Sequence, residues 1–473
     1  MATGQTRRVS VLDTLFLWSE RPETMMHVAA LLPFTPPADV SPTYLRDIVD
    51  QARASGAVAA PWNLKLRHTR LLPGPVAAWV PDDEIDLDYH VRRSALASPG
   101  DERELGVLVS RLHSHPLDLT RPPWEMHIIE GLEGGRFAIY IKIHHSLVDG
   151  YTGMRLLTRS MSTDPHDRST PLFFAAPGPP EPGRDDGPQP DFGRLVRGLA
   201  RESESALELA RRVIEPLLRR EHDEHLVPVP QAPYSILNRR IGRSRRFAIQ
   251  QYPLALLKQL GAERGATIND VLLTIVGGGL RAWLSELGEL PAKSLIALVP
   301  VNVRSPGDRG GGNAVGAMLA PLGTHVADPV ERLERVAVST RAAKAQLEGM
   351  TPAAILAYSA LLLAPTGVQV AAALAGVRPP LPLAFNLTVS NVPGPREPMY
   401  FCGSRLMGHY PASITTHGCA LNVTIHSYAD TANLGFIGDR DALPHLQRLA
   451  VRTGEALGQL ERAMSRAPAR LPA

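Results

Sequence analysis

The stretch His144-His145-Ser146-Leu147-Val148-Asp149-Gly150 is the most informative part of this chain. It follows residues 136–143, in which β-branched and aromatic side chains dominate, as is typical of a buried strand. Two histidines therefore stand where a strand ends, and an Asp-Gly turn signal follows them. A histidine at a strand end can be held rigidly and still face a cleft. It then offers what a general base needs, a near-neutral pKa and a fixed position.

Two other interpretations of this stretch are simpler. One is a core histidine beside a turn, although a His-His pair followed by Asp-Gly is costly to bury without a purpose. The other is a metal site, which needs three or four convergent ligands. Only His144, His145 and Asp149 are close together in the sequence, so we expect no metal here. General acid–base catalysis is the favoured interpretation.

Composition bounds the class of protein. The chain has 473 residues, enough for two or three domains or two large lobes, and 44% of them are hydrophobic. A net charge of +3 gives no indication of nucleic-acid binding, but it suits an anionic thioester or an anionic membrane surface. The two cysteines, Cys402 and Cys419, give neither a disulfide framework nor a zinc pattern, which fits a reducing cytosol. No apolar segment typical of a secretory signal follows residues 1–9, so we expect a cytoplasmic protein that is not secreted.

Helical and strand-like patterns alternate in two halves of the chain. The patterns predict helices over residues 45–54, 104–113, 254–264 and 271–284, and strands over 27–34, 125–131, 136–143, 247–252, 295–303 and 384–389. This alternation indicates α/β lobes with mixed sheets. Residues 175–192 are rich in Pro, Gly and Asp, and residues 193–221 have helical spacing with many arginines and glutamates, which favours a solvated linking helix over a membrane-surface helix. We therefore expect an N-terminal lobe (1–172), a linker with a linking helix (173–240) and a C-terminal lobe (241–473).

Residues 349–377 carry no formal charge. Pro352, Pro365 and Gly367 divide this stretch into halves that are each too short to cross a bilayer. Two apolar helices that line a tunnel or touch a membrane surface fit it better than a transmembrane span.

Four residues outside the histidine motif are candidates for the site. Asn269 is predicted just before a helix, where its amide and the helix N-terminal N–H groups suit either a developing oxyanion or ordinary capping. Ser390 and Asn391 follow a strand and begin a predicted sharp loop, from which either side chain can reach a substrate carbonyl. Trp124 follows two prolines; packing is its default role, and substrate contact is the alternative.

Taken together, these motifs resemble the HHxxxDG acyltransferase superfamily, which includes chloramphenicol acetyltransferase and peptide-synthetase condensation domains. Within it, the chain resembles the bacterial wax ester synthase/acyl-CoA:diacylglycerol acyltransferases over nearly its whole length. The matching motifs, in order, are Leu12-Asp13-Thr14-Leu15-Phe16-Leu17-Trp18, Pro122-Pro123-Trp124, the HHSLVDG stretch, Asn269-Asp270, Pro300-Val301-Asn302-Val303-Arg304 and Ser390-Asn391-Val392-Pro393-Gly394-Pro395. The family usually has Pro-Leu-Trp at the second motif and more often has Ser where Asn302 stands.

The resemblance implies a two-lobed fold of the chloramphenicol-acetyltransferase type, with a channel between the lobes. His145 would be the general base, with His144 in support and Gly150 in the turn. Asp149 would form a structural salt bridge with Arg304; the alternative is that it orients the histidine as in a triad. Acyl-CoA would be a substrate rather than a bound cofactor, and a diacylglycerol or a long-chain alcohol would accept the acyl group. The chain contains no G-x-S-x-G motif, which favours direct attack over a serine-acyl route.

Such proteins associate peripherally with the inner membrane face or with lipid inclusions, and we expect the same here. Two other functions remain open from the sequence. One is an acyltransferase that takes its acyl group from a carrier protein, as condensation domains do. The other is a lipid-binding protein without catalytic activity, against which the intact His145, Asp149 and Gly150 argue.

Overall fold

The computed structural model describes residues 7–9, 11–54, 56, 58–67, 78–148, 150–176, 232–302, 315–348, 355, 358–359, 366–378 and 383–466. Most of the predicted linker, the linking helix, Asp149, Arg304 and most of residues 349–365 lie outside these ranges. The lobe limits drawn through the linker therefore stay a prediction.

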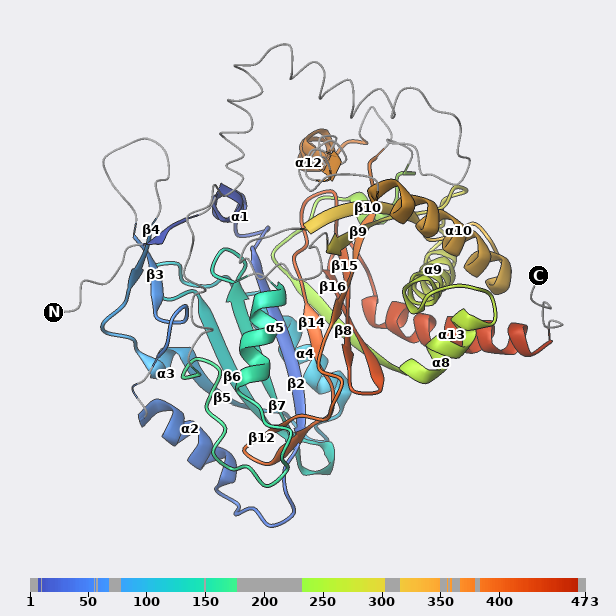
Figure 1. The fold of residues 1–473 in the computed structure, drawn as a ribbon. Coiled ribbons are helices and arrows are strands. Elements are labelled where there is room, and N and C mark those ends of the chain that lie inside the picture. The colour runs from blue at the N-terminus through green and yellow to red at the C-terminus, as the bar shows by residue number, and fades with distance from the viewer. Residues whose placement is uncertain are drawn as a thin grey trace.

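The first lobe is built on a mixed seven-stranded sheet (Figure 1). Its strands run in the order β12 (Tyr400–Phe401), β13 (Ser404–Leu406), β2 (His27–Thr35), β7 (Arg136–His144), β6 (Trp124–Leu132) and β5 (Val91–Ala95), and β14 (Tyr410–Ala412) also pairs with β2. A small sheet lies beside it, with β1 (Arg7–Arg8), β4 (Ala78–Pro81) and β3 (Leu64–Arg67). Strands β12 to β14 come from the C-terminal half of the chain, so the two lobes share a sheet.

The helices of this lobe cover both faces of the sheet. They are α1 (Val11–Ser19), α2 (Tyr44–Ala54), α3 (Leu87–His90), α4 (Glu102–His113) and α5 (Gly150–Arg159). Because side chains alternate along a strand, β7 sends Phe137, Ile139, Ile141 and Ile143 into one core with α2 and α5. Ala138 and Tyr140 enter a second core with α4, which also contacts β8 of the other lobe.

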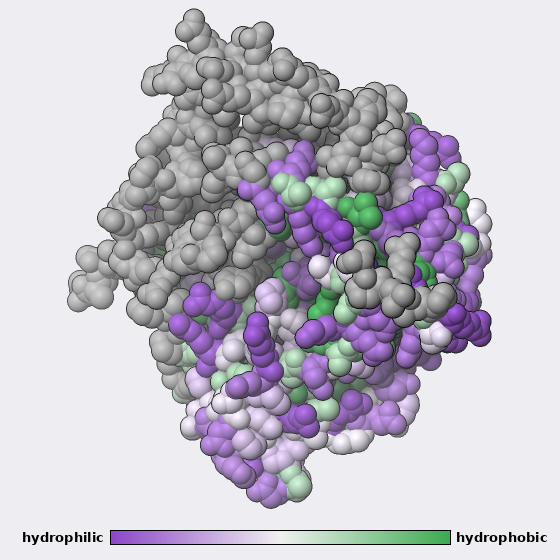
Figure 2. All heavy atoms as spheres, turned by 45° about the vertical axis from the view of Figure 1, so that its right-hand side comes forward, coloured by the Kyte–Doolittle hydropathy of each residue, from purple (hydrophilic) through white to green (hydrophobic). Residues whose placement is uncertain are grey.

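The second lobe has a mixed six-stranded sheet. Its order is β10 (Val315–Pro321), β9 (Ile296–Asn302), β11 (Leu387–Pro393), β15 (Leu421–Tyr428), β16 (Thr431–Asp439) and β8 (Arg245–Pro253). The helices of this lobe are α8 (Leu254–Ala262), α9 (Ile268–Glu286), α10 (Pro329–Glu348), α12 (Thr366–Leu374) and α13 (Leu446–Arg466). Figure 2 shows the molecule turned so that the right-hand side of Figure 1 comes forward. The coloured surface in this view is mostly hydrophilic, and its hydrophobic residues are visible chiefly in recesses.

Helix α9 is the centre of this lobe. Three consecutive glycines let neighbouring segments approach it closely: a Cβ at Gly277 would lie 2.0 Å from the Leu322 carbonyl oxygen, and one at Gly279 would lie 2.4 Å from Thr453 Oγ1. Thirteen residues of α9 are buried, which explains its nearly continuous apolar sequence.

The predicted helices and strands are confirmed with boundaries shifted by a few residues, except near Ser390. The sequence predicts that the strand ends at Val389, but β11 runs from Leu387 to Pro393. Its pairing with β9 involves only Leu387 and Thr388, so the lack of an N–H at Pro393 breaks no bond on that side. The predicted loop at Ser390 and Asn391 is therefore wrong, and both residues are in the strand.

Candidate active site

The two histidines stand at the junction between β7 and α5. His144 is the last residue of β7, and its backbone N–H donates to the Pro123 carbonyl at 2.9 Å. The backbone N–H of His145 donates to the Met26 carbonyl at 2.8 Å. Since Pro123 and Met26 lie just before the neighbouring strands β6 and β2, the backbone of both histidines is held from two sides.

The side chain of His144 is wholly enclosed, with 1% of its surface exposed. Its Nδ1 accepts from the Ser146 backbone N–H at 3.2 Å and lies 2.6 Å from the Ser146 hydroxyl oxygen. In the neutral ring the proton therefore stands on Nε2, which lies 3.4 Å from a carboxylate oxygen of Glu20 without the alignment of a hydrogen bond. This arrangement suits a supporting role better than proton transfer to a substrate.

Glu20 connects His144 to the backbone that holds His145. The same carboxylate oxygen accepts from the Met26 N–H at 2.5 Å, and the Met26 carbonyl receives the His145 N–H. Glu20 was not predicted as a site residue, because its partners are six residues or more away and no local pattern marks it.

The ring of His145 is only partly buried and stacks on Phe16 of α1. The two ring centroids lie 4.4 Å apart with 27° between the planes. Phe16 belongs to the opening motif of the chain, and no role was predicted for it. The stack orients the imidazole, which follows the end of β7 as predicted, and the role of His145 as a general base stays a prediction.

The rest of the motif is described in part. Gly150 is the first residue of α5, so the motif ends where a helix begins. Asp149 and its predicted partner Arg304 lie outside the described residues, and their salt bridge stays a prediction.

Asn269 lies inside α9 and not before it. Thr267 caps the helix: its hydroxyl accepts from the Asp270 N–H at 3.3 Å, and the Asp270 carboxylate accepts from the Thr267 N–H at 2.8 Å. Asp270 is buried and also accepts from the Thr340 hydroxyl at 2.6 Å, which joins α9 to α10. Capping is thus performed by Thr267 and Asp270, and the oxyanion or alcohol-orienting role of Asn269 stays a prediction.

The remaining predicted contacts have different surroundings. Ser390 is half-buried and Asn391 is exposed in β11, beside Thr424 and Ile425 of β15. Trp124 has no exposed surface, and its indole N–H donates to the Trp62 carbonyl at 2.7 Å. This burial supports the packing role of Trp124 and provides no surface for a direct substrate contact.

A buried polar cluster lies on the same face of the sheet as His144. Lys142 donates to the carbonyls of Leu112 and His115 at the end of α4, and its Nζ lies 3.4 Å from Glu125. Burial alone would raise the pKa of Glu125, but the adjacent His127 ring, 3.5 Å away, and the charges of Lys142 and a nearby arginine lower it to about 2. The cluster joins strand β7 to α4 beneath the site. Among the described residues, no group of three or more His, Cys, Asp or Glu side chains is placed to hold a metal ion.

Comparison with known proteins identifies the family. The model of the wax ester synthase/diacylglycerol acyltransferase catalytic domain matches residues 9–272, and that of the WS/DGAT C-terminal domain matches residues 311–461. A Mycobacterium tuberculosis protein named as a diacylglycerol O-acyltransferase is 58% identical and covers 96% of this chain and 97% of its own length. O-acyltransferase WSD of Acinetobacter baylyi is 38% identical, with coverages of 96% and 97%.

A solved structure of the same family is similar to this chain over nearly its whole length. The wax ester synthase/diacylglycerol acyltransferase of Marinobacter aquaeolei VT8 is 35% identical, with a TM-score of 0.77 over 97% of this chain and 100% of that one. The first condensation domain of the CDA synthetase shares only the fold, with 17% identity and a TM-score of 0.56 over 98% and 97% of the two chains. The expected fold, with its mixed sheets in two lobes, is confirmed. This chain is an acyltransferase, and it belongs to the wax ester synthase/diacylglycerol acyltransferase family.

Proposed function

We propose that this enzyme moves a long-chain acyl group from acyl-CoA to the hydroxyl of a diacylglycerol or of a long-chain alcohol, with His145 as the general base. The observation that carries the proposal is the position of His145, whose backbone is held by Met26 and whose ring stacks on Phe16. The products are triacylglycerol or wax ester, together with free CoA. No permanently bound cofactor takes part.

The reaction needs one histidine and no covalent enzyme intermediate. His145 takes the proton of the acceptor hydroxyl as its oxygen attacks the thioester carbonyl carbon. The tetrahedral intermediate then collapses, the carbon–sulfur bond breaks, and the imidazolium gives its proton to the departing thiolate. We assign Asn269 the stabilisation of the oxyanion or the orientation of the alcohol, and Ser390 the binding of a substrate carbonyl. We assign Asp149 a structural role with Arg304.

The test is a transfer assay with purified protein, palmitoyl-CoA and either hexadecanol or a diacylglycerol. Thiol release and ester are both measured. His145→Ala should lower the rate roughly 10²- to 10⁴-fold, whereas His166→Ala, at an exposed histidine, should not change it. Ester formed equally well by His145→Ala contradicts the assignment. Transfer from an acylated carrier protein but not from acyl-CoA would show that the acyl donor is a carrier-protein thioester. Lipid binding without any turnover would favour a lipid-binding protein without catalytic activity.

We propose in addition that α1 and the end of α12 contact a lipid surface. No helix in the described part of the chain is long and apolar enough to span a membrane. Leu15 and Trp18 of α1 are 49% and 53% exposed, and Leu374 and Val377 at the end of α12 are 45% and 55% exposed. Both helices lie at the same end of the molecule, the top in Figure 1. Exposed apolar side chains gathered at one end favour a membrane or lipid-inclusion surface.

Tryptophan fluorescence tests this contact directly. All five tryptophans are described, and the four others are at most 1% exposed, so only Trp18 can report on a lipid surface. Its emission should shift to shorter wavelength when phospholipid vesicles are added, and Leu15→Ser should weaken vesicle co-sedimentation. Unchanged emission and undiminished co-sedimentation would contradict the proposal.

A further inference from the structure

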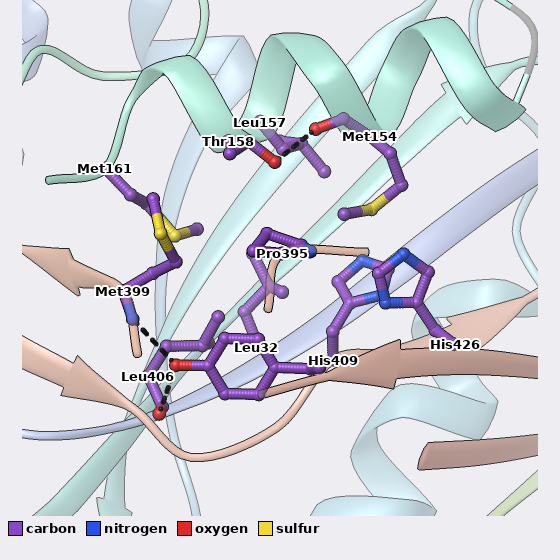
Figure 3. Close-up of a pocket in the computed structure, with 11 residues that line it drawn as sticks. Leu32, Met154, Leu157, Thr158, Met161, Pro395, Met399, Leu406, His409 and His426 are labelled. Carbon is purple, nitrogen blue, oxygen red and sulfur yellow. Dashed lines mark hydrogen bonds between the residues drawn. The ribbon is translucent and has the colours of Figure 1, made fainter. Parts of the chain in front are cut away.

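A small apolar cavity lies between the two lobes, behind α5 (Figure 3). Leucines and methionines line most of it, and in the described structure it has room for about one water molecule. The rings of His409 and His426 lie at the end of the cavity beneath Met154, whereas Met161 and Met399 lie at the other end. Met154 is one helical turn from Gly150, so the histidines are at the end nearest the HHSLVDG motif.

The two histidines are an anomaly in this apolar setting. They are 4% and 1% exposed, and their ring centroids lie 4.1 Å apart. Neither ring nitrogen of either residue has a hydrogen-bond partner among the described residues. Burial lowers the pKa of His409 far below its usual range and that of His426 to about 4, so both rings are neutral and each offers one N–H.

The other polar groups on the cavity wall have partners. The Thr158 hydroxyl donates to the Met154 carbonyl at 2.9 Å. The Tyr428 hydroxyl donates to the Leu406 carbonyl at 3.0 Å and accepts from the Met399 N–H at 2.9 Å. Buried polar groups are nearly always paired in native proteins, and an unpaired one calls for an explanation. A ligand oxygen is the explanation that also uses the cavity.

We propose that His409 and His426 form a subsite for the acyl acceptor, in which their N–H groups donate to ester carbonyl oxygens of a diacylglycerol. The inference rests on the proposed function and deepens it. A diacylglycerol carries two ester carbonyls next to its hydroxyl, whereas the chain of a long-chain alcohol has no oxygen beyond the hydroxyl itself. The pair therefore favours glycerides over simple alcohols.

Two features of the cavity suit such a ligand. Three methionines line it, and their unbranched side chains can rotate to widen it for an acyl chain. The family motif at Ser390 also passes directly over His426: a Cβ at Gly394 would lie 2.1 Å from His426 Cε1, and Val392 is its register partner on β11. His426 thus lies against the segment that carries the predicted carbonyl-binding serine.

The test compares two acceptors that differ only in the carbonyls. One is a diacylglycerol, and the other is the dialkylglycerol of equal chain length, in which ether linkages replace the esters. Because one neutral hydrogen bond changes an equilibrium roughly two- to tenfold, wild type should prefer the diacylglycerol in kcat/KM by on the order of tenfold. His409→Leu and His426→Leu should bring this ratio toward one and should lower the ratio of triacylglycerol to wax ester.

Control variants separate hydrogen bonding from shape and stability. His409→Gln keeps an N–H donor and should retain most of the preference. Leu157→Met changes the shape of the cavity without changing its polarity and should leave the ratio unaltered. The leucine variants should be at least as heat-stable as wild type, because each removes unpaired buried nitrogens.

An equal ratio for wild type and both leucine variants, or a wild type that does not distinguish the two glycerolipids, overturns the subsite. A wild type that esterifies no acceptor at all overturns the proposed function instead, and the subsite falls with it.

Discussion

Replacing Glu20 tests whether the loop before β2 holds His144 and His145 in place. The Glu20 side chain is 16% exposed; it accepts from the Met26 N–H at 2.5 Å and lies 3.4 Å from His144 Nε2. Glu20→Gln keeps the shape but turns a charge-assisted bond into a neutral one, a loss of about 1 kcal/mol or roughly fivefold in rate. Glu20→Ala leaves the Met26 N–H unpaired, which costs about 1–3 kcal/mol, or roughly 5- to 150-fold.

Steady-state kinetics with palmitoyl-CoA and a diacylglycerol measure this effect. The loss should appear in kcat, with KM for palmitoyl-CoA near the wild-type value, because Glu20 contacts His144 and Met26 rather than substrate. Glu84→Gln makes the same change of charge at an exposed side chain and should be silent. Wild-type kcat in Glu20→Ala, or a loss confined to KM, would refute the reasoning.

Three further substitutions test which contacts stabilise the fold. Since the pKa of Glu125 is lowered in the folded protein from 4.5 to about 2, its contribution to stability is present above pH 4.5 and is lost as pH falls toward 2; Glu125→Gln should therefore show a smaller loss of Tm over that range than wild type. Gly394→Ala places a Cβ 2.1 Å from His426 Cε1 and should destabilise the protein by about 1–3 kcal/mol or more, seen as a lower urea midpoint. Asp270→Ala removes a helix cap and the hydrogen bond from the Thr340 hydroxyl, so the free energy of unfolding should fall by about 2–4 kcal/mol, and an unchanged melting temperature would contradict this.

The features predicted well from sequence are those with local causes. Strand β7 and the turn into α5 follow from a continuous apolar run and an Asp-Gly signal, and α9 follows from a cap and a long apolar helix. The error at Ser390 also has a local cause: the Pro-Gly signal at Pro393 and Gly394 predicts a loop, but the strand extends to Pro393 because β15 still pairs with it.

The features that were missed depend on residues far apart in the chain. Glu20 acquires its role from His144, and His426 of β15 contacts His409, which lies in the loop before β14. Strands β12 to β14 are only two or three residues long and show no periodicity. Strands β13 and β14 form because β2, more than 360 residues earlier, offers a free edge, and β12 pairs with β13. No window of sequence contains both sides of such a contact.

The same three strands set the folding behaviour of the chain. Strand β2 has seven buried residues of nine, and residues 404–412 occupy the edge that β7 leaves open. A fragment that ends near residue 172 would expose this apolar edge and offer it to other chains, a known route to aggregation. The sheet of the first lobe can therefore be completed only after residues 404–412 have been synthesised. For the same reason, a chimera of two family members that is joined at the linker must also exchange the strands that pair with β2.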